Sequence, residues 1–284
     1  MWQLWPALGL LSQLRRLQLY QKKYGDPLDA LRLASLPPSL ARLEVTVLDE
    51  LHIVGTGLLP SLTSLVVSST AGLVIDAPLV SLRELRLFFV RGAQLRGSQL
   101  QLPQLTLLHL SDAGHQIDLQ RMPSLRCISF WGSSPTVLPG LAALSHVTSL
   151  VFQVLSDDHL VEVLECTLAH LCHLGLHIPH RREGIPCEQR SLVSVLQRST
   201  QLTSLTIHDT GLLPHLTAVP RLRSLVCEEL SAAELDIEDL NSLAGLKHLT
   251  ELVFSEAVPD RDERAKCLQL LTRVLPDGCK ITLP

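Results

Sequence analysis

Histidines and cysteines gather in one stretch of the sequence, and these residue types together could bind a zinc ion. The stretch holds seven candidates: Cys166, Cys172, His173, His177, His180, Cys187 and His208. His173 and His177 lie four residues apart in a segment predicted to be a strand, which separates them by roughly 13 Å. Two ligands that far apart cannot share one metal ion. We therefore expect no metal here, and the histidines can form either a pH-sensitive polar surface or an ordinary solvated one.

The sequence contains none of the motifs that commonly carry catalysis. It has no G-x-S-x-G, no phosphate-binding loop, no G-x-G-x-x-G and no H-E-x-x-H. Serine, histidine and aspartate are frequent, but no spacing brings them together. We therefore predict neither an enzymatic activity nor a cofactor, and no small-molecule substrate is implied.

Binding to another protein is the chemistry that remains. Aromatic residues make up only 4% of the chain, yet Phe88 and Trp131 each come directly after a short apolar segment that is predicted to be a strand, and Arg86 lies within the first of these segments. Aromatic and arginine side chains contribute most of the binding energy in many protein interfaces. Whether these three side chains face solvent depends on the elements that hold them.

A short apolar pattern, L-x-x-L-x-L, defines those elements. Residues 105–110 show it clearly, as L-T-L-L-H-L, and other apolar residues replace some leucines elsewhere. Along a strand the apolar positions point to one face and the x positions to the other. One such unit cannot bury its leucines alone, but a stack of them can. The copies begin at Leu14, Leu40, Leu62, Leu82, Leu105, Leu125, Val147, Leu171, Leu202, Leu222 and Leu249.

This pattern resembles the leucine-rich repeat superfamily over essentially the whole chain. The resemblance implies an α/β solenoid, or horseshoe, of about eleven repeats with a parallel β-sheet on its concave face. We expect one domain over 1–284, with an N-terminal edge at 1–13, repeats over 14–258, and a closing helix and strand over 259–284. The irregular repeat lengths are similar to those of plant-type arrays, including F-box proteins, although the sequence contains no F-box.

The segments that return between strands should lie on the convex face and change along the chain. Between residues 60 and 139 many repeats open with proline, which favours extended or 3-10 structure over a helix. The apolar spacing predicts helices over 157–169, 187–198 and 260–275. Residues 231–234, S-A-A-E, have the sequence of a capping box at the start of a helix.

The strand alternation places the candidate binding residues on the outward face of the sheet. His109 should lie between Arg86 and Ser129 on adjacent strands, and His177 should neighbour His208. These side chains can either bind a protein on the concave face or pack sideways against their neighbours. The predicted partner-binding residues are Arg86, Phe88, His109, Ser129, Trp131, His173, His177 and His208.

Charge and cysteine content limit the partners and the cellular compartment that we expect for the protein. The formal net charge is −4 and the pI is near 6.3, which does not suggest a nucleic-acid-binding surface. Seven cysteines without regular spacing argue against a disulfide framework and favour a reducing compartment, so we expect a cytoplasmic protein. No apolar run is long enough to span a membrane, and the apolar start lacks the basic region and cleavage site of a signal peptide.

The sequence therefore favours a protein-binding module that uses its concave face and catalyses nothing. One alternative is the substrate-recognition part of an F-box-type ubiquitin ligase, which requires an F-box segment outside this sequence. The other is a secreted or cell-surface ectodomain that binds a ligand.

Overall fold

The structure is a computed structural model in which the chain divides into two compact units, Met1–Val147 (unit 1) and Thr148–Pro284 (unit 2). Each unit is described by itself, and the single domain expected from the sequence stays a prediction. The described residues are 9–21, 31–48, 50–54, 59–68, 72–90, 93–95, 102–111, 116–117, 119–131, 145–153, 170–177, 194, 196–208, 212–228, 230–258 and 260–284.

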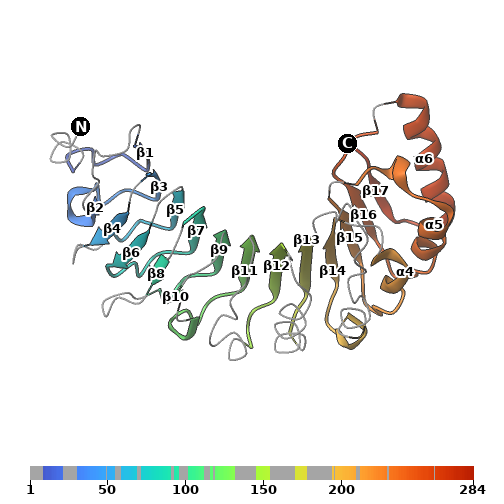
Figure 1. Ribbon diagram of the computed structural model, residues 1–284, viewed down its shortest axis with the longest axis horizontal. Helices are drawn as coiled ribbons and strands as arrows, with labels where there is room; N and C mark the ends of the chain where they lie inside the picture. Colours follow the sequence, from blue (N-terminus) through green and yellow to red (C-terminus); the bar gives the residue numbers. More distant parts are fainter. Residues whose placement is uncertain are drawn as a thin grey trace. The chain divides into compact units, whose positions relative to one another are not determined.

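Unit 1 contains a first parallel sheet whose strands follow one another in chain order (Figure 1). Each strand pairs with the next so that equivalent positions of the pattern meet, as Leu43 does with Leu65. The apolar residues of the pattern point inward and most are buried, because stacking removes them from water, whereas Leu17 and Leu19 on the edge strand are half-buried. The strands are β1 (Arg16–Tyr20), β3 (Arg42–Thr46), β5 (Ser64–Ser68), β7 (Glu84–Phe88), β9 (Leu107–Ser111) and β11 (Cys127–Trp131).

The returning segments of unit 1 form a second parallel sheet. Two of its strands, Leu51–Val54 and Leu73–Asp76, alternate buried and half-buried residues, so their apolar side chains also enter the core. Short 3-10 turns at Leu33–Ser35 and Leu119–Arg121 complete these returns. Extended and 3-10 returns were predicted, whereas their pairing into a sheet was not. The strands are β2 (Leu31–Arg32), β4 (Leu51–Val54), β6 (Leu73–Asp76), β8 (Ala93–Leu95) and β10 (Gln116–Ile117).

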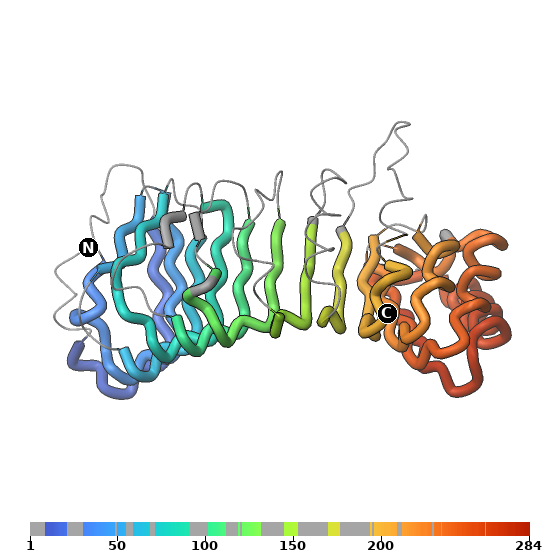
Figure 2. The backbone as a smooth tube through the Cα atoms, turned by 90° about the horizontal axis from the view of Figure 1, so that it is seen from below, coloured from blue at the N-terminus to red at the C-terminus, as the bar shows by residue number. Residues whose placement is uncertain are grey.

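Unit 2 contains parallel strands that again pair with equivalent positions in register, as Leu174 does with Leu205. Figure 2 shows the first of these strands running side by side. The last strand is the closing strand predicted from the sequence. The strands are β12 (Ser149–Gln153), β13 (His173–His177), β14 (Ser204–Ile207), β15 (Ser224–Cys227), β16 (Glu251–Phe254) and β17 (Lys280–Thr282).

Helices appear in the returns of unit 2: α4 (Leu213–Leu216), α5 (Ile237–Ala244) and α6 (Arg261–Val274). The helix α6 agrees with the prediction for 260–275, residues 194 and 196–198 are helical as predicted, and 157–169 lies outside the described residues. At the predicted capping box, Ser231 Oγ accepts a hydrogen bond of 3.3 Å from the backbone N–H of Ala233, at the start of a 3-10 turn over 232–234. A second capping box, which was not predicted, is made by Asp236 and Asp239 at the start of α5.

No helix in the described ranges is both long and apolar enough to cross a membrane.

Candidate functional site

Three neighbouring strands of unit 1 bring the predicted binding residues of that unit together. The register pairs Arg86 on β7 with His109 on β9, and His109 with Ser129 on β11. The alternating leucines of these strands are buried, so the residues between them lie on the outward face, as the sequence predicted.

Aromatic rings meet on this outward face. The ring centroids of Phe88 and His109 lie 4.6 Å apart with the planes tilted by 45°. Those of His109 and Trp131 lie 6.2 Å apart at 41°. Tilted arrangements at these distances are favourable for aromatic pairs. We call Phe88, His109, Ser129 and Trp131 the aromatic cluster.

The hydroxyl of Ser129 connects two of these rings. The indole Nε1 of Trp131 donates a hydrogen bond of 2.9 Å to Ser129 Oγ, because an indole nitrogen can only donate. The same oxygen lies 3.1 Å from His109 Nδ1. Ser129 is buried, at 8% exposed, whereas Trp131 remains 37% exposed. A buried hydroxyl therefore fixes an exposed tryptophan in one orientation.

The electrostatics of the cluster keep His109 neutral at physiological pH. Burial, and then the nearby charge of Arg86, lower the pKa of His109 from 6.5 to about 4. Within the described structure its Nε2 atom is buried and has no hydrogen-bond partner. Protonation would place a charge on an unsolvated ring, which explains the direction of the pKa shift.

Arg86 is held by its own strand rather than by the rings. Its Nε donates a hydrogen bond of 2.5 Å to Oε1 of Glu84, two residues earlier on the same face. The Arg86 side chain is 43% exposed and the Glu84 side chain 24%. An ion pair this exposed contributes little to stability, so the arginine can still contact a partner.

Phe89 follows Phe88 in the chain and is exposed, which the sequence did not predict. The alternation of β7 would point it inward, but its φ of 58° lies in the left-handed region, and the side chain is 64% exposed. Its backbone N–H donates a hydrogen bond of 2.6 Å to Ser111 Oγ, and Val90 is buried instead. The left-handed conformation costs about 1–2 kcal/mol in a non-glycine residue. No sequence pattern signals it, because phenylalanine rarely adopts it.

Two of the predicted binding histidines of unit 2 contact different polar residues. His173 Nδ1 lies 2.8 Å from Ser204 Oγ, and burial lowers the pKa of His173 although Glu228 opposes this. His208 Nε2 lies 2.8 Å from Glu228 Oε2. The backbone of His177 follows Leu176, which pairs with Ile207, so His177 and His208 hold corresponding positions. The side chain of His177 lies outside the described residues.

No group of three potential metal ligands is found among the described histidines, cysteines, aspartates and glutamates. Three residues of the cluster considered from the sequence, Cys166, His180 and Cys187, lie outside that part of the chain.

Comparisons with known proteins give no family assignment. No protein-family model matches the sequence, and no curated protein matches it. Similar solved structures include the TLR13–ssRNA13 complex, which is 18% identical, with 84% of this chain and 44% of that chain covered and a TM-score of 0.45. This chain therefore spans less than half of the TLR13 chain.

Two bacterial structures are also similar. An internalin from Listeria monocytogenes is 16% identical, with 86% of this chain and 80% of that chain covered and a TM-score of 0.34. A leucine-rich repeat protein from Leptospira interrogans is 15% identical, with 96% and 91% covered and a TM-score of 0.29. In this chain, the copies of L-x-x-L-x-L each lead into a strand of a parallel sheet with their leucines inside, which is the leucine-rich repeat solenoid fold.

Proposed function

We propose that the chain is a protein-binding module and that the aromatic cluster on the outward face of unit 1 is its main contact surface. The observation that carries the proposal is Trp131, an exposed aromatic ring that Ser129 fixes beside His109. The mechanism is recognition by shape and apolar contact, without catalysis.

The physical argument rests on preorganisation. Binding normally costs conformational entropy when side chains become ordered at an interface. Here the orientation of Trp131 is set by its hydrogen bond, and its ring is supported by His109. Phe89, which follows Phe88 in the chain, supplies a second exposed ring. A partner can bury both rings while little further ordering is needed.

A reducing compartment such as the cytoplasm is part of the proposal. Within the described part of the chain, no disulfide is formed by the five cysteines Cys127, Cys172, Cys227, Cys267 and Cys279. Titration of the unfolded protein with a thiol reagent, without reductant, should count seven free thiols for the seven cysteines of the chain. A smaller number would reveal disulfides and favour the secreted alternative.

The test compares affinity capture by the full chain and by two variants, with quantitative mass spectrometry as the readout. We expect Trp131→Ala to lose the proteins that the wild type recovers. Tyr20→Ala is the matched control, because Tyr20 is an exposed aromatic residue, 56% exposed, on the edge strand β1 of the same sheet. Thermal unfolding of each variant establishes that the fold is retained.

Equal recovery of every protein by wild type and Trp131→Ala would show that the cluster is not the contact surface. Loss with both variants would equally contradict the proposal, because the effect would then not be specific to the cluster.

A further inference from the structure

An open groove of about 810 Å³ lies in unit 2, at the turns that lead into β15, β16 and β17. Arg221 and Arg223 line it from the first of these turns, and Lys247 and His248 from the second. We call these four residues and the space between them the basic groove. Its members are far apart in sequence, and the stacking of successive repeats brings them together.

The charge of the groove is unbalanced. The lining contains two arginines, one lysine and one histidine, but a single carboxylate, Asp277. Among the described residues, none of the four basic side chains forms an ion pair, and Arg221 only approaches the amide oxygen of Gln201, at 3.5 Å. The chain as a whole carries a formal net charge of −4. A local excess of positive charge in an acidic protein attracts anionic partners.

The backbone of the groove offers little to a single phosphate ion. The N–H groups of Leu222, Arg223, Leu249 and Thr250 already donate hydrogen bonds within the fold. Pro220 has no N–H to donate. Phosphate sites usually use several convergent backbone N–H groups. Here the positive charges sit instead on side chains of two successive turns, which lie roughly 4.8 Å apart in a stack of parallel strands. Such a row of charges suits several carboxylates in series.

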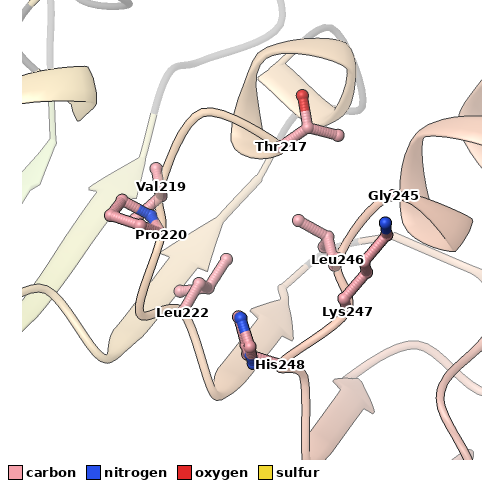
Figure 3. Close-up of a pocket in the computed structure, with 8 residues that line it drawn as sticks. All are labelled: Thr217, Val219, Pro220, Leu222, Gly245, Leu246, Lys247 and His248. Atoms are coloured by element: carbon pink, nitrogen blue, oxygen red, sulfur yellow. The ribbon is translucent and has the colours of Figure 1, made fainter.

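A smaller, mostly apolar cavity of about 300 Å³ adjoins the groove and shares Lys247 and His248 with it (Figure 3). Figure 3 shows Leu222 and Leu246 extending toward one another from the two turns. Both leucines are nearly buried, at 2% and 4% exposed, and so form an apolar floor. The site therefore combines positive charge with a recess for one apolar side chain.

We propose that the basic groove binds an acidic peptide segment. Two or more carboxylates of the peptide meet Arg221, Arg223 and Lys247, and an apolar side chain between them enters the smaller cavity. The proposal rests on charge complementarity. The apolar recess distinguishes a site for a peptide from a surface that attracts any anion. The surface is distinct from the aromatic cluster, so the proposal stands independently of the proposed function.

The experiment measures the fluorescence anisotropy of a labelled peptide in which glutamates flank one leucine, with the full chain as receptor. The peptide should bind, and the affinity should fall as salt is added, because salt screens charge pairs. The double variant Arg221→Glu/Arg223→Glu should weaken binding at least about tenfold, which corresponds to about 1.4 kcal/mol. The same peptide with glutamine in place of glutamate should not bind.

A matched control is the double variant Arg83→Glu/Arg126→Glu. Both residues are exposed in unit 1 and hold the same position of the repeat as Arg223. Each double variant replaces two arginines with glutamate, so the net charge of the protein changes equally. This variant should bind the peptide like the wild type. The single variant Lys247→Gln provides a milder test if the first double variant fails to fold, as judged by thermal unfolding, and it too should weaken binding.

Three results would overturn the proposal. The first is no detectable binding of the glutamate peptide, and the second is equal weakening by the two double variants. The third is binding of a single-stranded RNA oligonucleotide at the groove without binding of the peptide, which would assign the charge to a nucleic-acid backbone instead.

Discussion

At the scale of single residues, His109 reports most directly on the environment of the aromatic cluster. Its imidazole should titrate near pH 4 in the folded protein, because burial and the charge of Arg86 disfavour its protonated form. A pH titration followed by NMR on the histidine ring protons measures this pKa. The resonance is assigned by its absence from His109→Gln. A pKa of His109 near 6.5 would show that the ring is solvated and the cluster open.

The lowered pKa of His109 also makes the free energy of unfolding depend on pH. The pKa of His109 is lower in the folded state than in the unfolded chain, so the unfolded chain binds the extra proton first as the pH falls. The contribution of neutral His109 to the free energy of unfolding is therefore fully present above about pH 6.5. This contribution is lost as the pH falls toward about 4. The free energy of unfolding should depend less steeply on pH in this window for His109→Gln than for the wild type. Identical pH slopes would contradict the assignment.

Ser129 is the residue on which the geometry of the cluster depends. Replacing it with alanine removes the acceptor for Trp131 Nε1 and the partner of His109 Nδ1. We expect Ser129→Ala to lower the free energy of unfolding by about 1–2 kcal/mol, the net value of two hydrogen bonds. Denaturant unfolding measures this change. Ser129→Thr keeps the hydroxyl and should lose much less, so equal losses would argue against the hydrogen bonds as the cause.

At the scale of elements, the edge strand β1 is secured by one carboxylate on β3. Glu44 accepts hydrogen bonds from Arg16 Nη2 at 2.9 Å, from Arg42 Nε at 2.7 Å, and from Gln18. Burial raises the pKa of Glu44, but these hydrogen bonds and the two arginine charges outweigh it, so the pKa lies below its ordinary value. The leucines of β1 are only half-buried, so this polar anchor matters more here than in the interior strands.

Glu44→Gln should therefore loosen β1 specifically. Amide hydrogen exchange should become faster in β1 and stay unchanged in β5, where Leu65 and Val67 are buried and a neighbouring strand pairs on each side. In the wild type, the stabilisation from Glu44 is present above its ordinary pKa and is lost as the pH falls through its lower folded value. Uniform acceleration across the sheet, or none in β1, would contradict this role.

The elements that could be predicted from the sequence are those with local signals. The pattern L-x-x-L-x-L fixes which residues of a strand point inward, and the equal register then places Arg86, His109 and Ser129 side by side. The second sheet of unit 1 was missed because its strands are short, at two to four residues, and their pairing depends on the stack. The capping box of α5 was not predicted because two sequences nearby, at 231–234 and 236–239, both suit a cap.

The candidate binding residues likewise differ in whether they could be predicted from the sequence. The aromatic cluster could be predicted because it lies within strands, where alternation determines direction. Phe89 could not, since its left-handed φ reverses the direction that alternation gives. The basic groove could not either, because Arg221 and Lys247 are separated by a whole repeat and lie in turns without a periodic pattern.

At the scale of the whole molecule, the reactivity of the cysteine thiols reports which regions are closed to solvent. Cys172 is exposed, whereas Cys227 is buried, and burial, followed by the charge of Asp239, raises the pKa of Cys227 to about 12. A thiol with so high a pKa holds almost no thiolate at neutral pH and reacts slowly.

Thiol labelling of the native protein should therefore modify Cys172 early and Cys227 only on unfolding. Mass spectrometry of labelled peptides after increasing times distinguishes the two sites. Modification of both cysteines at equal rates would show that the stack around β15 is open. Cys172→Ser serves as the control that identifies the early signal.

Each unit carries one candidate surface: the aromatic cluster lies in unit 1 and the basic groove in unit 2. A repeat stack permits this, because each turn contacts mainly its neighbours and outward residues can change without disturbing the leucine core. The central claim is that the aromatic cluster contacts a protein partner.

Site-specific photo-crosslinking tests that claim most directly. A photoreactive phenylalanine analogue replaces Phe89 in one preparation and Tyr20 in another, since both are exposed aromatic residues of unit 1. We expect a discrete crosslinked protein from position 89 that disappears when Trp131→Ala is added, and none from position 20. Crosslinks of equal yield from both positions, or an adduct at 89 that is unaffected by Trp131→Ala, would contradict it.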